Sequence, residues 1–233
     1  IPFNFESPNH TARQLVTNPE NATASPKGWH DTNTITGNTA NLKYTYTRGN
    51  NTWARADFTS VNPTSHNTNP ANSGFAPDGG AALSFDFPYP GTTVSASTYI
   101  SAATTNLFYM TNVLHDIWYQ YGFNEPNGNF QQTNYISGGS ASDAVWGDAQ
   151  DGSQVATPAT NNANFSTPVD GSRPRMQMFL WNYGPKSLFV LSPPSIAGDY
   201  YSADNGFDPG NIPVPSAPDF IQTEVALYLD TDP

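Results

Sequence analysis

Residues 101–121 constrain the fold more than any other stretch. Large apolar residues recur there every three or four positions, the period of an α-helix with one apolar face. These residues are Leu107, Met110, Leu114, Ile117, Trp118 and Tyr121. Ser97 or Ser101 can cap the start, and Gly122 stands where a left-handed residue commonly ends a helix. Such a helix spans about 30 Å and can back a whole β-sheet. Its wide aromatic stripe predicts burial on more than one side.

Short strands between turn residues are predicted before this helix. Polar and apolar residues alternate in residues 42–47 (LKYTYT) and again in residues 83–87 (LSFDF). Residues 53–58 are a further short apolar and aromatic piece between turn residues, whereas residues 62–80 are rich in Asn, Pro, Ser and Gly and predict a long loop. The prediction is an α+β, β-rich fold. A twisted, mostly antiparallel sheet packs on one long helix, and long Pro-, Asn- and Gly-rich loops join the strands.

Residues 161–181 (NNANFSTPVDGSRPRMQMFLW) predict two short strands around an irregular loop. Residues 175–180 alternate polar and apolar as far as Phe179, which is typical of a half-buried strand. The first arm, NNANF, is short and polar and predicts a strand at the edge of a sheet. An edge strand carries unpaired main-chain groups that can pair with another extended chain. The alternative is that a loop merely covers this edge.

The C-terminal part is predicted to be largely extended. Residues 186–191 read as a short strand, and residues 192–218 contain six prolines and predict a Pro-rich surface excursion. Residues 225–233 begin with VALYL and predict a terminal strand. No internal repeat and no clear linker interrupts the sequence, so residues 1–233 are predicted to form a single domain.

Composition disfavours several classes of partner. The 233 residues include only eight Lys and Arg, spread singly, with a net charge of −11, so there is no basic patch for nucleic acid. The absence of cysteine excludes disulfides and thiolate metal sites. No apolar run approaches the roughly 20 residues that a membrane span needs. Only 12% of residues are charged, and this amide- and hydroxyl-rich composition favours a secreted, extracellular protein.

Short motifs indicate no catalytic residue. The four histidines are His10, His30, His66 and His115. None of them begins an H-E-x-x-H motif, so the pair of zinc ligands on one helix face is absent. His115 lies alone in the predicted helix, where a hydrogen-bonding role is favoured over a metal ligand. Neither a G-x-S-x-G motif nor a phosphate-binding glycine loop occurs.

Three acidic residues that lie close together are candidate calcium ligands. Calcium prefers oxygen ligands, and Asp143, Asp148 and Asp151 can supply them. Their spacing does not match an EF-hand loop, so solvated loop carboxylates are the favoured alternative. A pair of carboxylates for glycoside hydrolysis also stays open, without a pattern that singles it out.

Several pieces together resemble the fungalysin family of secreted zinc metallopeptidases. They are TNLFYMTNVLHDIWYQYGFNEPNGNFQ, DAQDG and NNANFSTPVDGSRPRMQMFLW, and the resemblance covers nearly all of residues 1–181. It implies a thermolysin-like N-terminal lobe, in which a twisted sheet packs on a long helix. It also implies that NNANF lines the substrate cleft. Asn162 would use its amide and Ala163 its backbone to hold substrate main chain, and Phe165 would be a supporting aromatic residue.

The resemblance also shows what the chain lacks. The family's zinc ligands and general base belong to H-E-x-x-H and the helix that follows it, and both lie C-terminal to anything in this sequence. Residues 1–233 therefore resemble the first half of a catalytic unit, with residues 225–233 leading into a missing segment. Such a chain should be inactive alone and should hold no cofactor, with zinc arriving in the other half.

Three hypotheses follow. The leading one is a substrate-binding N-terminal half of a secreted zinc metalloendopeptidase, which holds extended peptide by edge-strand pairing and needs its missing half as a partner. The second is a non-catalytic extracellular structural protein that self-assembles into an oligomer or fibre through its exposed strands and apolar surface. The third is a carbohydrate-binding β module, suggested by the aromatic and Asn/Thr-rich composition.

Overall fold

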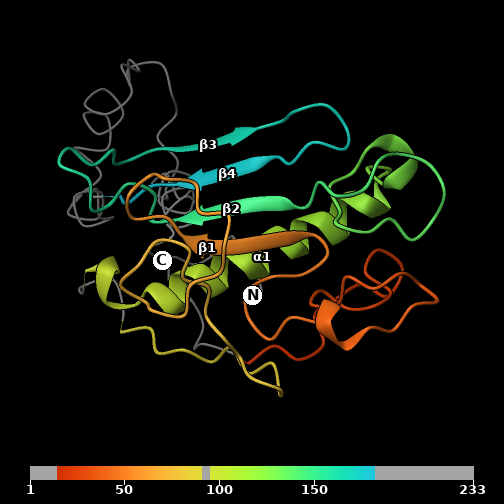
Figure 1. Cartoon of the computed structure of the whole chain (residues 1–233), viewed down its shortest axis with the longest axis horizontal. Helices are drawn as coiled ribbons and strands as arrows, with labels where there is room; N and C mark the ends of the chain where they lie inside the picture. Colours follow the sequence, from red (N-terminus) through yellow and green to blue (C-terminus); the bar gives the residue numbers. More distant parts are fainter. Residues whose placement is uncertain (1–14, 91–94, 182–233) are drawn as a thin grey trace, which may run out of the picture. The chain divides into compact units, whose positions relative to one another are not determined.

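The computed structural model describes residues 15–90 and 95–181, which contain a four-stranded sheet and one long helix (Figure 1). The strands are β1 (Thr52–Ala56), β2 (Val145–Ala149), β3 (Ala163–Ser166) and β4 (Arg175–Met178), and the long helix is α1 (Ile100–Gln120). Three short 3-10 helices are η1 (Ala40–Leu42), η2 (Ala96–Thr98) and η3 (Glu125–Asn127). The predicted α+β class and the predicted helix are confirmed. The predicted strand and excursion in residues 186–233 lie outside the described residues, and the single domain stays a prediction.

The sheet is mixed, with the strand order β1-β2-β4-β3. β1 pairs with β2 and β2 with β4 in parallel, while β3 pairs with β4 in antiparallel orientation. The expectation of mostly antiparallel pairing therefore differs from the observed ladders. The segment between β1 and β2 contains α1, and such a crossover returns the chain in the same direction. Alternation within one strand carries no information about the direction of its partner.

Two predicted strands are absent as regular elements. Residues 42–47 form only isolated bridges, such as the one between Tyr46 and Asp78, although the rings of Tyr44 and Tyr46 do meet at 5.3 Å on a shared side. Residues 83–87 are irregular. In both segments, the alternating side chains reach aromatic partners without a neighbouring strand. Residues 53–58 and 175–180, in contrast, contain β1 and β4.

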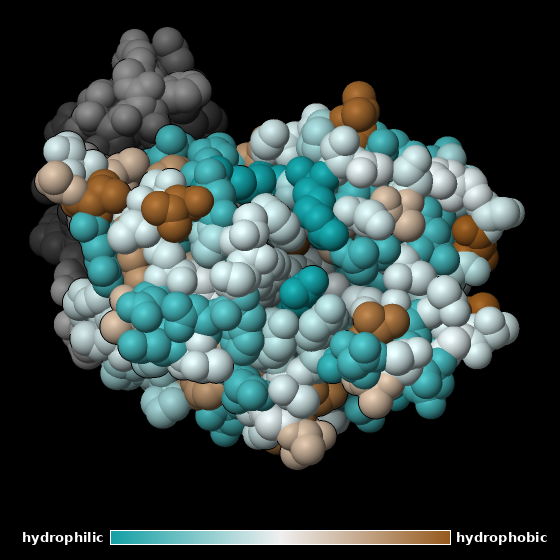
Figure 2. Space-filling view, in the orientation of Figure 1, coloured by the Kyte–Doolittle hydropathy of each residue, from teal (hydrophilic) through white to brown (hydrophobic). Residues whose placement is uncertain are grey.

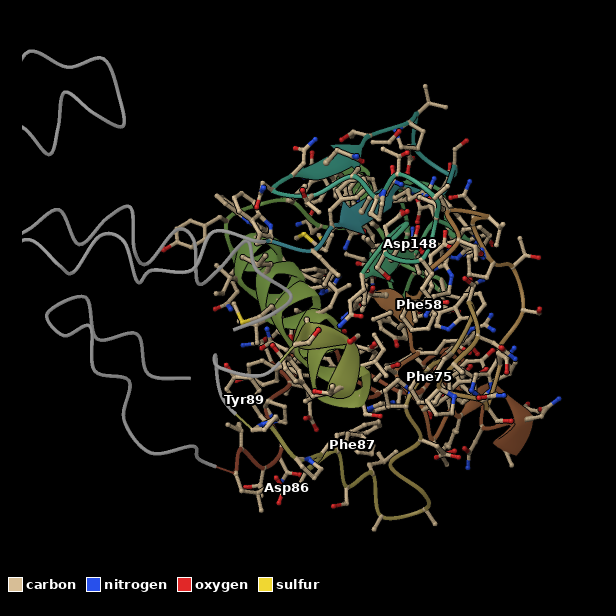
Figure 3. The ribbon with its side chains drawn as sticks, turned by 90° about the vertical axis from the view of Figure 1, so that its left-hand side faces the viewer. Phe58, Phe75, Asp86, Phe87, Tyr89 and Asp148 are labelled. Carbon is tan, nitrogen blue, oxygen red and sulfur yellow. The ribbon has the colours of Figure 1, made fainter. Side chains whose placement is uncertain are left out.

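One face of the sheet is built from small side chains and packs on α1. Ala54 and Ala56 on β1 and Ala149 on β2 are fully buried in a cluster with Leu107 and Phe108 of α1. Gly147 lies in the same row of the sheet, and a Cβ added to it would stand 3.2 Å from Leu107 Cδ2. The small residues therefore let the helix approach the sheet closely. The sheet and α1 are seen from the side in Figure 3.

The two ends of α1 differ in how they are capped. Tyr99 occupies the N-cap position without a side-chain capping bond, so the predicted Ser97 or Ser101 cap is wrong; η2 leads directly into the helix. At the other end, Gly122 has φ of +100°, as predicted. The amides of Gly122 and Phe123 donate to the carbonyls of Tyr119 and Trp118, at 3.1 and 3.0 Å. This paired arrangement is the Schellman ending of a helix.

The apolar stripe predicted on α1 is buried only in part. Leu107 is 5% exposed, but Leu114, Ile117, Trp118 and Tyr121 are exposed in the described structure. The reason lies in the polar residues of the same helix, since buried Asn112 and Asp116 turn that face inward. On the molecular face shown in Figure 2, hydrophobic side chains stand mostly singly among polar ones. Within residues 15–90 and 95–181, no helix is long and apolar enough to cross a membrane.

His30 lies among aromatic rings near the start of the described chain. Its ring stacks on Phe85 with centroids 5.1 Å apart and contacts Phe108 at 4.8 Å. Its Nδ1 atom is buried without a hydrogen-bond partner. Burial lowers the pKa of His30 to about 4, and hydrogen bonds to the backbone offset only part of this effect. A positive charge is therefore disfavoured at this position.

Replacing Gly147 should separate the helix from the sheet. Gly147→Val is expected to lower the free energy of unfolding by about 1–3 kcal/mol, because the added methyl groups overlap Leu107. Gly147→Ala should cost less, since its single methyl group is tight only against the flexible Leu107 side chain and lies 3.7 Å from Ala54 Cα. Urea unfolding of both variants measures the difference. Equal stability of wild type and Gly147→Val would contradict the close packing described.

His30 should make stability depend on pH. Between the ordinary pKa of 6.5 and the lowered value of about 4, the unfolded chain binds a proton that the folded chain does not. The stabilisation is thus complete above the ordinary pKa and is lost as the pH falls through the lowered one, by about 3 kcal/mol. His30→Phe keeps the ring stacking and should flatten this slope in urea unfolding series. His66→Phe, which removes an imidazole stacked on Tyr46, is the matched control.

Candidate functional site

β3 lies at the open edge of the sheet. β1 is the strand at the opposite edge, and loop residues cover it. The amides of Ala54 and Ala56 donate to the carbonyls of Thr47 and Phe75, at 2.9 and 2.8 Å. β3 pairs with β4 on one side, and within the described ranges no strand pairs with its other side. The predicted edge strand at NNANF is therefore confirmed.

The main chain of β3 alternates between β4 and the open edge. The amide of Phe179 donates to the carbonyl of Asn162 at 3.2 Å, so Asn162 faces β4. Hydrogen-bonded and non-hydrogen-bonded pairs alternate along an antiparallel ladder, and Ala163 and Phe165 are consequently the residues whose amides and carbonyls point outward. These groups are the ones that an added strand would pair with.

The side chains of the predicted site residues are accounted for in part. The exposed Asn162 accepts a hydrogen bond from the Ala163 amide through Oδ1, at 2.9 Å. The Asn162 side chain thus satisfies the outward-pointing amide of Ala163. Phe165 is 42% exposed and its ring lies 6.0 Å from that of Phe130, which contacts Phe123 at 5.3 Å. The supporting role of Phe165 and the substrate-binding roles of Asn162 and Ala163 stay predictions.

The loop between β3 and β4 is tied to residues 131–143. Buried Asp143 accepts hydrogen bonds from the amides of Gln131 and Gly171, at 2.9 and 3.0 Å. Asp170 accepts one from the Ser140 amide at 2.8 Å. Burial raises the pKa of Asp143, and these amide donors act against that rise. Asp143 therefore anchors the hairpin that carries the edge strand.

Three buried carboxylates gather on the sheet face that points away from α1. Asp57, Asp148 and Asp151 each offer an oxygen within 4.8 Å of the others. Asp148 is labelled in Figure 3. The structure thus brings together two of the predicted calcium candidates, Asp148 and Asp151, with Asp57 as an unpredicted third, and it places Asp143 in the hairpin anchor instead. Calcium binding stays a prediction.

Two guanidinium groups already neutralise most of this charge. Arg175 contacts Asp148 through Nε and lies 3.0 Å from Asp151 and 3.7 Å from Asp57 through Nη2. Arg55, which is fully buried, lies 3.0 Å from Asp148. Three carboxylates and two arginines leave one net negative charge. This composition is that of a buried ionic cluster, which we call the Arg–Asp cluster.

The Arg–Asp cluster joins three strands. Burial raises the pKa of Asp148 to about 6 although the two arginines oppose the rise, and burial lowers the pKa of Arg55 to about 10. The guanidinium of Arg55 lies over the rings of Trp53 and Trp146, at 4.7 Å from each centroid. These contacts bind β1, β2 and β4 on one face, while small apolar side chains bind them to α1 on the other.

The described histidines do not form a zinc site. His115 Nδ1 donates a hydrogen bond to the carboxylate of Asp116 at 2.9 Å, consistent with the hydrogen-bonding role expected for it. Asp116 also accepts hydrogen bonds from Ser25 Oγ and Trp29 Nε1, at 2.6 and 2.8 Å. Burial opposes ionisation of Asp116, but these donors and His115 together lower its pKa. Within the described ranges, the only grouped candidate ligands are the three carboxylates of the Arg–Asp cluster. They include no histidine and do not fit zinc.

The sequence matches the family described as "Fungalysin metallopeptidase (M36)" over residues 1–214. The chain belongs to the fungalysin family. It is 38% identical over 181 residues to "Extracellular metalloproteinase 1" of Phaeosphaeria nodorum, which covers 78% of this chain and 26% of that protein. It is 39% identical over 174 residues to "Extracellular metalloproteinase 5" of Trichophyton rubrum, covering 75% and 24%. This fungalysin chain thus spans about a quarter of the length of these relatives.

Sequence reasoning missed the Arg–Asp cluster of this fungalysin chain. Arg55 and Asp57 stand on alternate positions of WARAD, directly after Trp53, and Arg175 opens β4. Charged residues that alternate with alanine in this segment indicate a strand with an ionic face and a small apolar face. Closeness in sequence groups Asp143 with Asp148 and Asp151, whereas in the fold Asp57 takes its place.

Removing Arg175 should destabilise the protein strongly. Arg175→Met is expected to lower the free energy of unfolding by about 3–5 kcal/mol, because three buried carboxylates then share a single guanidinium. Adding Asp148→Asn to Arg175→Met should recover part of this loss. Arg173→Met, which removes a neighbouring arginine bonded to Gln132, is the control in thermal or urea unfolding. A cost no larger than that of the control would refute the assigned role.

Proposed function

We propose that this chain is the substrate-binding N-terminal part of a longer, secreted zinc metalloendopeptidase. The observation that carries the proposal is the outward-facing main chain of Ala163 and Phe165 on the open edge strand. Membership of the fungalysin family and the extracellular metalloproteinases among its relatives support it. The relatives' names and the small share of charged residues, 12% of the chain, favour secretion.

An extended peptide binds beside β3 as an additional strand. Its main chain pairs with the outward amide and carbonyl groups of Ala163 and Phe165, which read no side chain and so accept many sequences. The Asn162 side chain has to turn away from the Ala163 amide, and its own amide group then bonds the peptide backbone. Phe165, resting on Phe130, keeps this strand in place.

Catalysis belongs to the remainder of the longer polypeptide. The described residues hold no set of ligands that fits zinc, and no H-E-x-x-H motif occurs in the 233 residues. Zinc, when bound by the longer enzyme, would activate water for attack on the peptide bond. The contribution of this chain is to hold the peptide extended and in a fixed register beside β3.

The test compares two asparagines of the same strand segment in the full-length gene product. Asn162→Ala should lower kcat/KM for unfolded protein substrates by about tenfold, because one main-chain contact is lost. Asn164→Ala, two residues further along the chain and, like Asn162, facing β4 with its main chain, should change kcat/KM little. Urea unfolding of both variants shows whether stability is unaffected. Equal losses in both, or a full-length product without peptidase activity, would refute the proposal.

A further inference from the structure

In the second half of α1, polar side chains are buried and large apolar side chains are exposed. From residue 112 onward its buried positions are polar, with Asn112 fully buried and Asp116 5% exposed. Val113 packs against the core, but the other large apolar residues of this half and the C-cap residue Tyr121 point to solvent. Leu114 is 43% exposed, Ile117 42%, Trp118 55% and Tyr121 81%. A helix on the surface of a finished domain shows the opposite pattern.

Specific hydrogen bonds hold the helix in this orientation. Asn112 accepts a bond from Asn51 Nδ2 at 3.1 Å, next to β1. Asp116 accepts bonds from Ser25 Oγ, Trp29 Nε1 and the Asn21 amide. Turning the helix to bury its apolar side would withdraw Asn112 and Asp116 from these bonds. The buried donors of Ser25, Trp29 and Asn51 would then lose these acceptors. Rotation of α1 alone therefore cannot bury the exposed apolar face.

The exposed face is continuous with other aromatic surface and carries no charge. The rings of Trp118 and Tyr121 lie 6.2 Å apart, and partly exposed Phe123 follows directly after the helix. The ring contacts of Phe123 lead through Phe130 to Phe165 on the edge strand. Asp116, which is buried, is the only Asp, Glu, Lys or Arg of α1. The partner of this face must therefore be apolar rather than ionic.

We propose that an apolar segment of the remainder of the same longer polypeptide covers the face formed by Leu114, Ile117, Trp118 and Tyr121. This inference rests on the proposed function only in placing the chain within a longer peptidase. The relatives are about four times the length of the matched region, so ample chain exists to supply the cover. A tethered segment binds at a high effective concentration, which a separate molecule lacks.

The size of the face favours a tethered segment over a second copy. Two aromatic and two aliphatic side chains at these exposures present on the order of 400 Å², the size of a patch that usually has a function. A stable dimer commonly buries about 800 Å² on each partner. A contact within one polypeptide needs less area, because it does not bear the translational and rotational entropy of association.

Hydroxyl-radical footprinting of the full-length gene product tests the proposal. The labelling rate of each residue is compared between the native protein and the same protein unfolded in urea, which cancels intrinsic reactivity. Trp118 and Tyr121 should be protected about tenfold in the native monomer, as in a desolvated interface core. Leu15 and Val169, which are 76% and 78% exposed on this chain, are the comparison residues and should show little protection.

Two outcomes overturn the inference. One is a full-length monomer in which Trp118 and Tyr121 react as fast as the comparison residues. The other is protection that rises with protein concentration together with the mass from light scattering, which assigns the face to a second copy. The readout needs neither peptide nor catalysis, so a failed peptidase assay refutes the proposed function without touching this result.

A double variant gives an independent measure. Ile117→Ser with Trp118→Ser in the full-length protein should lower the melting temperature clearly more than Leu15→Ser with Val61→Ser, although both pairs are exposed on this chain. It should also increase labelling of Tyr121, because the covering segment detaches. If the double variant does not fold, the wild-type footprint still decides the question. Equal melting temperatures of the two double variants would contradict the proposal.

Discussion

The Arg–Asp cluster is the constraint on which the sheet depends. Asp148 stands at its centre, between Arg55 and Arg175, and its neighbours in the register come from β1 and β4. A buried ionic group is stable only if every partner is in place, because removing one leaves a desolvated charge. The cluster therefore favours one strand order and one register over the alternatives. The opposite face, made of alanine and glycine, could by itself slide with little penalty.

The position of the edge strand depends on the hairpin anchor and on the Arg–Asp cluster. β4 is held by Arg175 in the cluster, and β3 is held by β4, by the loop that Asp143 anchors and by the contact of Phe165 with Phe130. The outward main chain of Ala163 is consequently positioned by residues that never touch it. Such support keeps the backbone of β3 extended, and a preorganised backbone lowers the entropy cost of pairing with another strand.

Much of the fold follows from local patterns, and what escapes prediction is long-range. The period of residues 101–121 and Gly122 locates α1, and the short polar NNANF locates the edge strand. Parallel pairing could not be seen, because it depends on where the chain returns after α1. Residues 42–47 and 83–87 have the alternation of strands but lack neighbours to pair with. On α1, the inward turn of Asn112 and Asp116 depends on Ser25, Trp29 and Asn51, which lie far away in sequence.

The contact between Asn162 and the Ala163 amide has a further consequence. An open β edge invites association with any extended chain, including other copies of the protein. By satisfying its neighbour's outward donor, Asn162 lowers the gain that any newcomer obtains from pairing there. Any extended chain that pairs there has to displace this intramolecular bond first. The asparagine therefore makes the edge less adhesive than bare main chain would be.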